Sequence, residues 1–401
     1  MKVLVFNCGS STIKYQMIET DAQLALAKGS VERIGMSEGV LTHKPYDRDS
    51  VKISGEIVDH IKGTEYVISI LMSKNHGVIQ DKSEIDAIGH RVVHGGEAFS
   101  ESVLITDAVI KEIRNCIEFA PLHNPHNLRG INACSQTLPG IPQVAVFDTA
   151  FHQQMPEEAY FYPIPLKLYK KYGIRRYGFH GTSHYFVSRQ AAKLLNRPIE
   201  QLKMVTLHLG NGCSATAVKE GISIDTSMGF TPLEGLVMGT RCGDIDPAVV
   251  LHLLGREELT LHEGNTLLNK HSGLIGLSGF SSDMRDIFEE AQNGNKRAKI
   301  ALKVFCYRLK KYIGSYAVAM GGIDAVVFTA GIGENAWFVR EKTMAGMEFL
   351  GFRIDPEKNK ESVNEPRDIS GEKATARVLV VPTNEELVIA LEAARIVEGK
   401  H

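Results

Sequence analysis

Signals for nucleic-acid or membrane binding are absent from this sequence of 401 residues. The formal net charge is −2, so the chain lacks the basic excess that binds nucleic acid or an anionic lipid surface. No apolar run approaches the length of a membrane-spanning helix, and the apolar run Val3–Phe6 is too short for a secretory signal. We therefore expect a soluble, cytoplasmic protein whose partners are small molecules, with neither nucleic acid nor a membrane among them.

Several catalytic and metal-binding motifs are missing as well. The six cysteines are scattered and show no CxxC or other metal-ligand spacing, which fits a reducing compartment. The sequence contains no HExxH zinc motif, no GxSxG serine-hydrolase turn and no GxxxxGK(S/T) phosphate loop. These absences argue against a zinc protease, a serine hydrolase and a P-loop enzyme.

What the sequence does have is the length and composition of a two-domain globular protein. It is 43% hydrophobic and 23% charged, which is ordinary for a folded chain, and its length exceeds what one core usually holds. Strand-like segments alternate with amphipathic helical segments, which indicates an α/β fold. The clearest strands are expected at Ile85–Val93, Gln143–Phe147 and Arg377–Val381, and the clearest helices at Asp107–Phe119, Pro125–Leu138, Thr182–Leu195, 295–320 and Glu385–Val397.

A polar turn follows the first expected strand. Met1–Phe6 is mostly apolar, and the small residues after it predict a tight turn before β-type residues resume. Gly9 lets the backbone approach a ligand closely, and the neighbouring hydroxyl groups and amides are suitable donors to phosphate oxygens. Lys14 adds a positive charge, and Asn7 offers a neutral oxygen to a hydrated magnesium ion. Taken alone, this stretch is also compatible with a plain turn between two strands.

The same pattern occurs a second time. Met204–Leu209 leads into the Asn-, Gly- and Ser-containing turn Gly210–Thr216, after which a strand pattern returns. Later in each half, Ile85–Gly96 and Ile323–Asn335 run from a buried strand into a glycine-rich turn. We infer a duplication, and two similar halves would hold a nucleotide in the cleft between them.

Four ionisable residues stand at glycine-rich turns or at the end of a strand. Arg91 and Arg241 present planar forks that suit carboxylate or phosphate oxygens and could stabilise a transferring phosphoryl group. The alternative is that these arginines form ion pairs at the surface. We favour a functional role for Arg241, whereas for Arg91 the two interpretations are nearly equal. His180 precedes the start of a helix and could donate to a developing negative charge. Asp148 follows a buried strand, where α/β folds place site groups.

Three further motifs have competing interpretations. Gly331–Ala336 matches the GxGxx(G/A) dinucleotide fingerprint, with Asp355 at the expected distance, but too few residues follow it for a Rossmann domain. We therefore prefer a nucleotide-contacting turn of another kind. Asp283–Arg285 is either a helix cap or a nucleotide contact. Asn384–Glu386 places two carboxylates at the N-terminus of a helix. They could simply be stabilised there by the helix dipole, or one of them could hold magnesium.

Together these motifs resemble those of the acetokinase family, which belongs to the superfamily of actin, sugar kinases and heat-shock ATPases. The resemblance spans nearly the whole chain. Its most specific strings are Asn7–Ser11, Gly89–Gly96, Ala120–Pro125, Val146–Gln153, Gly178–His184, His208–Gly212, Thr226–Gly235 and Pro382–Glu386.

The resemblance implies an α/β fold of two ribonuclease H-like domains with duplicated topology and an interdomain nucleotide cleft. The first domain would comprise residues 1–150 plus 385–401, with the C-terminal helix packed back on it. The second domain, residues 151–384, would bind the nucleotide and form the contacts of a homodimer. The implied co-substrates are ATP and ADP, and the implied metal is Mg²⁺, with Mn²⁺ as an alternative.

The resemblance implies roles only for those residues of this chain whose motifs match the motifs of the family. The resemblance implies that Asn7 and Glu385 hold magnesium and that Arg91 binds a carboxylate substrate. The implied catalytic residues are Asp148, His180, Arg241 and Arg91, and the implied pocket for the substrate methyl group consists of Val93, Leu122 and Pro232. The implied nucleotide-binding residues are Lys14, His208, Leu209, Gly210, Asn211, Gly212, Asp283, Met284, Arg285, Gly331, Ile332, Gly333, Glu334 and Asn335.

The implied reaction is a reversible, magnesium-dependent, in-line transfer of the γ-phosphoryl group of ATP to acetate, giving acetyl phosphate and ADP. Propionate or another short-chain acid is the alternative acceptor. The family assigns an acid–base role to the residue matching Asp148. Because a simple carboxylic acid is already ionised at neutral pH, no base is needed, and we expect Asp148 to orient magnesium, its waters or an arginine.

Overall fold

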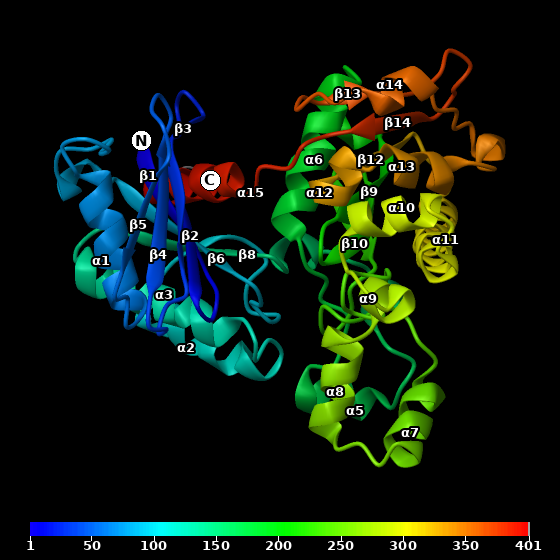
Figure 1. The fold of residues 1–401 in the computed structure, drawn as a ribbon, viewed down its shortest axis with the longest axis horizontal. Helices are drawn as coiled ribbons and strands as arrows, with labels where there is room; N and C mark the ends of the chain where they lie inside the picture. The colour runs from blue at the N-terminus through cyan, green and yellow to red at the C-terminus, as the bar shows by residue number, and fades with distance from the viewer. Residues whose placement is uncertain (400–401) are drawn as a thin grey trace. The chain divides into compact units, whose positions relative to one another are not determined.

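The computed structural model describes residues 1–399, which form two compact units (Figure 1). Unit 1 contains Met1–Ala150 together with the C-terminal segment from Asn384 onward, and unit 2 contains Phe151–Thr383. In Figure 1 the red C-terminal helix therefore joins the blue N-terminal strands in unit 1. Each unit is built on a single β-sheet with helices on its faces.

The sheet of unit 1 has eight strands in the order β5-β4-β3-β2-β1-β6-β8-β7. The first five strands form an antiparallel meander, whereas β6 is parallel to β1 and β8 is parallel to β6. The strands are β1 (Lys2–Cys8), β2 (Thr12–Glu19), β3 (Leu24–Glu32), β4 (Gly39–Pro45), β5 (Val51–Gly55), β6 (Ala87–Val92), β7 (Val103–Leu104) and β8 (Gln143–Phe147).

The helices of unit 1 cover both faces of this sheet. Buried apolar side chains of α1 and α3 form one core with β1–β4 and β6, while α15 packs against β1, β6 and β8 from the other side. The α-helices are α1 (His60–Leu71), α2 (Asp107–Asn115), α3 (Asn124–Thr137) and α15 (Glu385–Val397). Short 3-10 turns are η1 (Lys82–Glu84), η2 (Cys116–Glu118) and η3 (Ala150–His152), the last of which runs into unit 2.

The sheet of unit 2 has the order β11-β10-β9-β12-β14-β13. Strands β9, β10 and β11 are antiparallel, and β12 and β14 continue the sheet in parallel with β9. The strands are β9 (Lys203–Leu209), β10 (Cys213–Lys219), β11 (Ile222–Thr226), β12 (Ala325–Thr329), β13 (Arg367–Asp368) and β14 (Arg377–Val380).

Helix α6 packs on one side of this second sheet through an apolar core that includes β9, β12 and β14, and α11 also packs against β9 and β10. The helices of unit 2 are α4 (Glu157–Tyr160), α5 (Leu166–Tyr172), α6 (Gly181–Leu194), α7 (Pro247–Arg256), α8 (Leu261–Lys270), α9 (Gly273–Ser278), α10 (Met284–Gln292), α11 (Lys296–Ala319), α12 (Ala330–Asn335), α13 (Trp337–Met344) and α14 (Pro356–Lys360). Its short 3-10 turns are η4 (Ile199–Gln201) and η5 (Glu348–Leu350).

The two sheets share one topology. In each, three consecutive antiparallel strands (β1–β3 and β9–β11) are followed on the other side of the first strand by two parallel strands (β6 and β8, β12 and β14). The expected α/β fold with duplicated topology is therefore confirmed. Within residues 1–399, no helix has both the length and the apolar character needed to span a bilayer.

Both predicted polar hairpins are confirmed. Strand β1 pairs with β2 so that Asn7 lies opposite Lys14, and the Gly9 amide donates to the Thr12 carbonyl at 2.9 Å. Strand β9 pairs with β10 so that Leu209 lies opposite Cys213. Each turn projects from the edge of its sheet at which the first strand ends, so the predicted ligand-binding residues are presented at corresponding places in the two units.

We predict that the contact between β6 and α15 is sensitive to a single methyl group. A Cβ atom at Gly89 would lie 2.6 Å from Ile389 Cγ2, so Gly89→Ala should destabilise the protein by about 1–3 kcal/mol through overpacking. The midpoint of urea unfolding measures this. The double variant Gly89→Ala/Ile389→Ala provides the control, because the two changes compensate in volume and should cost less than the sum of the single changes. Strictly additive losses would contradict the contact.

Candidate active site

Three predicted site residues of unit 1 stand at the carboxyl ends of neighbouring strands. Asn7 is the penultimate residue of β1, Arg91 lies near the end of β6, and Asp148 directly follows β8. The parallel register pairs Phe6 with His90 and Arg91 with Val146, so these strand ends align at one edge of the sheet. Ligands of α/β folds bind at such an edge.

Arg91 and Asp148 form a bidentate ion pair. The Arg91 Nε atom donates to Asp148 Oδ1 at 3.0 Å and an Nη atom donates to Oδ2 at 2.5 Å. The Asp148 side chain is only 1% exposed. Burial opposes the charge on Arg91, but the carboxylates of Asp148, Glu385 and Glu386 outweigh burial and raise the pKa of the guanidinium. Orienting an arginine is one of the three roles expected for Asp148, and the structure shows this contact.

The N-terminus of α15 adds carboxylates to the same edge. Asn384 caps this helix by accepting a hydrogen bond from the Leu387 amide at 3.1 Å, which leaves Glu385 and Glu386 in the first turn. Burial raises the pKa of Glu386, and so does the charge of Glu385, whereas Arg91 and Lys14 act in the opposite direction. Opposite charges are thus concentrated where the strands of unit 1 end.

The oxygen donors of this edge fit a magnesium ion. No group of three or more His, Cys, Asp or Glu residues suited to a metal occurs among residues 1–399. Magnesium does not need such a group, because it commonly takes one or two protein oxygens and completes its shell with waters and substrate phosphates. The Asn7 amide and the Glu385 carboxylate supply oxygen ligands of the right kind.

Side chains that the sequence analysis missed support this edge. Asn127 of α3 donates to the Cys8 carbonyl at 3.2 Å and accepts from the Val93 amide at 3.1 Å, so it ties the end of β1 to the segment after β6. His60 of α1 contacts the Gly9 carbonyl through Nε2 at 2.8 Å. Val93 is buried, whereas Leu122, the other predicted pocket residue of unit 1, is 59% exposed. The sequence carried no signal for the partners of Asn127 or His60, because both contacts join distant segments.

In unit 2, the β9–β10 hairpin brings His180 and Arg241 together. The Gly210 amide donates to the Gly212 carbonyl at 3.0 Å, which closes the turn. A Cβ atom built on Gly212 would lie 3.4 Å from His180 Cε1 and 3.5 Å from an Nη atom of Arg241. Both side chains therefore border the turn, although they come from segments far apart in the sequence. Asn211 at the tip accepts a hydrogen bond from the Gly239 amide at 2.9 Å.

The Arg241 guanidinium is oriented from within unit 2. One Nη atom donates to the Pro232 carbonyl at 3.0 Å, and burial lowers the pKa of the guanidinium. Pro232, predicted as part of the methyl pocket, therefore also positions Arg241. The loop can pass close to Asn211 only because residue 239 is glycine, since a Cβ atom there would lie 2.0 Å from Asn211 Oδ1.

His180 has an unusual backbone conformation and a stacked side chain. It is the N-cap of α6 with φ 58°, a left-handed conformation that is uncommon outside glycine. Its ring stacks on that of His208 with centroids 4.2 Å apart and an interplanar angle of 24°. His208 contacts Ser183 Oγ through Nδ1 at 2.8 Å. Strain of this kind is typical of functional sites.

The remaining predicted nucleotide-binding residues lie on the short helix α12, at the N-terminus of α10 and at the end of β9. Gly331–Asn335 forms most of the short helix α12 after β12, and Glu334 Oε1 accepts from the Thr383 amide at 3.2 Å. Asp283 caps α10 and pairs with Arg285, which confirms the helix cap, while a nucleotide contact by these residues stays a prediction. Leu209 and Met284 are buried, with 0% and 3% of each residue exposed.

The dinucleotide interpretation of Gly331–Ala336 is wrong for this fold. Strand β12 lies in the middle of the sheet, and only β13 and β14 follow it among the described residues, without the further βαβ units of a Rossmann domain. Asp355, the residue spaced to bind a ribose, instead caps α14 by accepting from the Glu357 amide at 3.0 Å.

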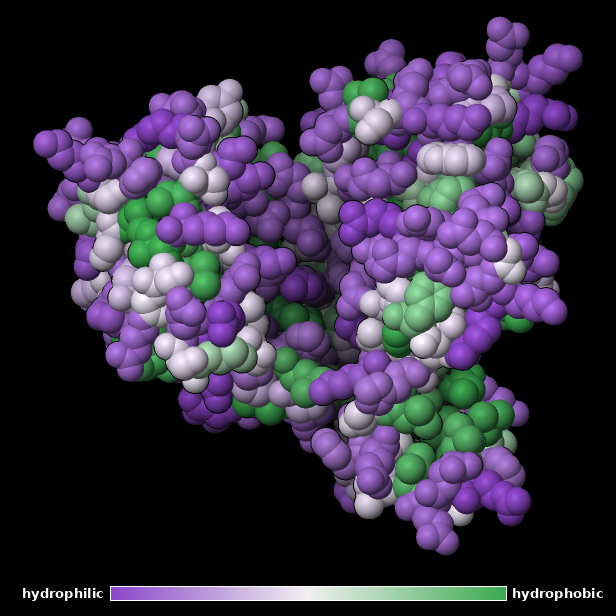
Figure 2. Space-filling model, viewed as in Figure 1, coloured by the Kyte–Doolittle hydropathy of each residue, from purple (hydrophilic) through white to green (hydrophobic). Residues whose placement is uncertain are grey.

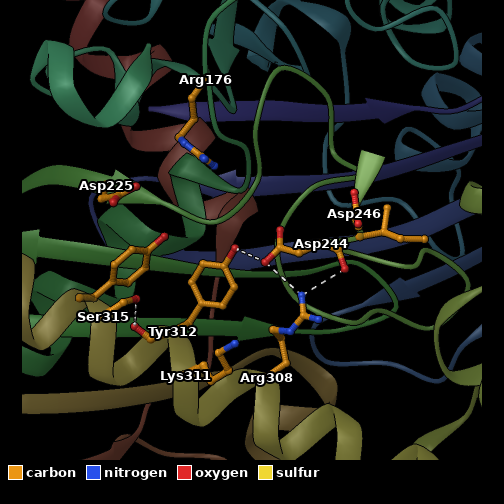
Figure 3. A pocket seen from close by; sticks show the side chains of 10 residues that line it. Arg176, Asp225, Asp244, Asp246, Arg308, Lys311, Tyr312 and Ser315 are labelled. Carbon is orange, nitrogen blue, oxygen red and sulfur yellow. Dashed lines mark hydrogen bonds and ion pairs between the residues drawn. The ribbon is translucent and has the colours of Figure 1, made fainter. Parts of the chain in front are cut away.

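A polar cavity of ≈ 520 Å³ in unit 2 contains none of the predicted site residues. Figure 3 shows Arg308 and Tyr312 of α11 directed toward Asp244, with the Tyr312 hydroxyl donating to Oδ2 at 2.8 Å. Burial raises the pKa of Asp225, on the same wall, to about 6. This cavity is separate from the β9–β10 turn and its neighbouring side chains.

The duplicated sheet topology, with a polar turn between the first two strands of each repeat, defines a protein of the ribonuclease H-like class that includes actin, sugar kinases and heat-shock ATPases. Comparison with known sequences narrows this class. The family model described as the acetokinase family matches residues 2–391, and the chain belongs to that family.

Individual relatives cover essentially the whole chain. The acetate kinase of Caldanaerobacter subterraneus subsp. tengcongensis is 57% identical over 400 residues, which is 100% of both chains. The crystal structure of acetate kinase from Porphyromonas gingivalis matches with a TM-score of 0.95 and 46% identity over 99% of each chain. A propionate kinase from Francisella tularensis matches with a TM-score of 0.92 and 42% identity over 98% of this chain and 99% of its own.

We predict that the guanidinium of Arg241 contributes to turnover rather than to folding. Arg241→Ala should lower kcat roughly 10²- to 10³-fold, as removal of one donor to a charged transition state does elsewhere. Arg241→Lys keeps the charge but loses the planar fork, so it should recover only part of the loss. Steady-state kinetics and circular dichroism of both variants test this. Near-normal turnover of Arg241→Ala would contradict the assignment.

Proposed function

We propose that this protein catalyses the reversible transfer of the γ-phosphoryl group of ATP to acetate, giving acetyl phosphate and ADP. The observation that carries the proposal is full-length membership of the acetokinase family, with relatives of 46–57% identity that are named acetate kinase. The sites described above supply the groups that this reaction needs: oriented arginines, a histidine, hydroxyl-rich turns and oxygen donors for a metal.

Catalysis of this reaction rests on positioning and charge stabilisation. Phosphoryl transfer passes through a loose transition state with charge spread over the three equatorial oxygens, and no covalent intermediate with the protein is required. We assign the stabilisation of these oxygens to Arg91, Arg241 and His180. The guanidinium groups of Arg91 and Arg241 are each held by an acceptor, an Asp148 carboxylate and the Pro232 carbonyl, so little reorganisation is needed when the substrate binds.

Nucleotide binding is assigned to Lys14 in unit 1 and to three segments of unit 2. The segments are the β9–β10 turn His208–Gly212, the start of α10 at Asp283–Arg285, and α12 at Gly331–Asn335. The segments lie at a turn, at a helix start and in a short helix after a strand, and backbone amides at such places suit phosphate and ribose oxygens.

The acetate carboxylate is assigned to Arg91, and the methyl group to a pocket formed by Val93, Leu122 and Pro232. Since acetate is ionised near neutral pH, the reaction does not require a general base. The bidentate pair supports a different role for Asp148, which is to hold the Arg91 guanidinium in position for the acceptor. The geometry supports this role over a proton-transfer role.

We assign a magnesium site to Asn7 and Glu385, with Mn²⁺ as an alternative ion. The ion would neutralise charge on the β- and γ-phosphate oxygens. Lys14, which lies opposite Asn7 in the hairpin, would contact the same phosphates. Lys14 and Arg91 oppose the charge of the two glutamates at this edge of unit 1.

We further propose that the protein acts as a homodimer in the cytoplasm. Apolar side chains are exposed on three helices of unit 2, and Figure 2 shows part of this apolar surface gathered over α7 and α8. The exposed residues are Val249 and Leu251 of α7, Leu261 of α8, and Ile300, Tyr307 and Val318 of α11. A second copy of unit 2 is the partner that the family resemblance supports. All six cysteines are free thiols, which suits a reducing compartment.

A hydroxylamine assay tests the reaction and its acceptor. A mixture of protein, ATP, MgCl₂, acetate and hydroxylamine should give an acyl hydroxamate, because hydroxylamine displaces phosphate from acetyl phosphate. Loss of ATP without formation of hydroxamate would indicate an ATPase and contradict the proposal. The second candidate acceptor is propionate, because one structural relative is a propionate kinase. One methylene group changes binding by only about 1–3 kcal/mol, so a panel from formate to butyrate should show kcat/KM highest for acetate and measurable for propionate. A higher kcat/KM for propionate would favour the second candidate.

We predict that Glu385 contributes specifically to magnesium dependence. Glu385→Gln replaces a charged oxygen ligand with a neutral one and should raise the magnesium concentration for half-maximal activity roughly tenfold or more. Activity titrated with MgCl₂ at fixed ATP provides the measurement. Glu392→Gln is the control, since Glu392 lies farther along α15 and pairs with Arg395 at 3.0 Å. An unchanged titration for Glu385→Gln would remove Glu385 from the metal site.

A further inference from the structure

A continuous chain of hydrogen bonds lies beneath the ring of His180. Thr206 Oγ1 contacts His184 Nδ1 at 2.7 Å, and His184 Nε2 contacts Ser214 Oγ at 2.7 Å. Ser214 Oγ in turn contacts His180 Nδ1 at 2.9 Å. Thr206, His184 and Ser214 are all completely buried. None of these three residues belongs to the predicted site or has a role in the proposed reaction.

Local structure explains why these groups meet. His180 caps α6 and His184 lies one turn later, so their side chains are neighbours on the same side of the helix. Thr206 of β9 and Ser214 of β10 both face α6, because each makes a hydrogen bond to His184. The (i, i+4) spacing of two histidines, which in sequence resembles half of a zinc site, here forms a hydrogen-bonded pair bridged by the Ser214 hydroxyl.

The protonation state of His184 restricts the direction of the chain. Burial, with smaller contributions from His152 and His208, lowers the pKa of His184 well below its ordinary value, so the ring is neutral. A neutral imidazole has one N–H donor and one bare nitrogen acceptor. His184 therefore donates to one of its two hydroxyl partners and accepts from the other.

The buried hydroxyl of Thr206 decides which partner donates. Among residues 1–399, the hydrogen bond that the structure shows for this hydroxyl is the one to His184 Nδ1. If His184 donated from Nδ1, the Thr206 proton would be buried without an acceptor, which is costly. Thr206 therefore donates to Nδ1, His184 donates from Nε2 to Ser214, and the Ser214 proton is left to point at His180 Nδ1. Every hydroxyl and imidazole proton then has an acceptor.

This direction fixes the tautomer of His180. Because Nδ1 accepts from Ser214, the proton of the neutral ring is on Nε2. A Cβ atom at Gly212 would lie 3.5 Å from His180 Nε2, so this nitrogen borders the β9–β10 turn beside Arg241. The N–H group is thus presented on the side of the ring where the phosphoryl group is proposed to bind.

We propose that Ser214, oriented by His184 and Thr206, is a positioning residue that holds His180 as the neutral Nε2–H tautomer, which donates a hydrogen bond to the transferring phosphoryl group. No proton is transferred, and the hydrogen-bond chain only sets which nitrogen carries it. The inference rests on the proposed function for the identity of the acceptor, whereas the tautomer itself follows from the chain of contacts.

The groups around His180 agree with a neutral ring. His208 stacks on it at 4.2 Å, His184 lies behind it through Ser214, and the Arg241 guanidinium borders the same glycine. A second positive charge would be repelled by Arg241, and a protonated Nδ1 would displace the Ser214 proton from its acceptor. Neutral His180 can still donate from Nε2 without depending on a proton from solvent.

Nitrogen NMR of the protein labelled with ¹⁵N-histidine tests the tautomer directly. His180 is assigned from the signals that disappear in His180→Gln. At neutral pH, Nδ1 of His180 should show the shift of a bare imidazole nitrogen and Nε2 that of an N–H nitrogen. The opposite pattern, or two N–H nitrogens, would overturn the inference.

Two variants test the chain behind the ring. Ser214→Ala removes the donor to Nδ1, and Thr206→Val removes the group that sets the direction without touching His180. Both should move the His180 nitrogen shifts toward a mixture of protonation states and lower kcat roughly 10- to 100-fold, the range known for residues that orient a functional group, with little change in KM for ATP. Thr206→Ser keeps the hydroxyl and should restore both readouts.

Thr216→Val is the matched control. Its hydroxyl is buried on β10, as that of Ser214 is, but it contacts Thr226 Oγ1 at 2.9 Å and no histidine. Thr216→Val should leave the His180 signals unchanged even if stability falls. Equal shifts in this control would assign the effect to general packing and overturn the inference.

The two readouts separate this inference from the proposed function. If acetate yields no hydroxamate but the His180 signals behave as described, the reaction assignment fails and the tautomer stands. If hydroxamate forms while Ser214→Ala leaves the His180 signals and kcat unchanged, the inference fails and the reaction stands.

Discussion

Parallel pairing next to the first strand of each sheet determines where the candidate site residues lie. Because β6 pairs with β1 and β8 with β6, the segments carrying Asn7, Arg91 and Asp148 end at one edge. In unit 2 the parallel pairing of β12 with β9 likewise places the start of α12 next to the end of β9. A shift of either register would separate these residues, whichever helices covered the sheet. The position of each polar turn therefore follows from backbone hydrogen bonding and from the apolar cores that fix the register.

Within these edges, charged and polar groups are held by hydrogen-bond partners belonging to the protein. Arg91 is held by a buried carboxylate and Arg241 by a backbone carbonyl, and His180 is hydrogen-bonded to the Ser214 hydroxyl. Holding a cation this way reduces the reorganisation that a transferring phosphoryl group would otherwise demand. The carboxylate beside Arg91 also explains how a half-buried guanidinium retains its charge, since burial alone would disfavour it. The same contact supports an orienting role for Asp148 over a proton-transfer role.

Much of this arrangement could be predicted from short motifs. The two polar hairpins, the strand preceding Asp148 and the helix after Asn384 were all expected from local patterns, because turn chemistry and alternation of apolar residues act over a few positions. The contacts of Asn127, His60 and Ser214 could not be predicted in this way. Each of these side chains makes a hydrogen bond to a group many residues away. No local sequence pattern around a single asparagine, histidine or serine identifies such a distant partner. The spacing of the paired histidines of α6 favoured hydrogen bonding over metal binding, but it could not identify Ser214 and Thr206 as their partners.

The amino-acid sequence alone determined the fold class, the duplication, the family resemblance and the list of candidate residues, because these depend on patterns that are local or repeated along the chain. Tertiary structure alone decided that Asp148 pairs with Arg91, that Pro232 holds Arg241 and that Thr206 and His184 lie behind His180. Those pairings depend on strand register and on how α6 packs against β9 and β10. The physical reason is that the direction of a hydrogen bond is set by which donors and acceptors are buried together, and burial is a property of the whole fold.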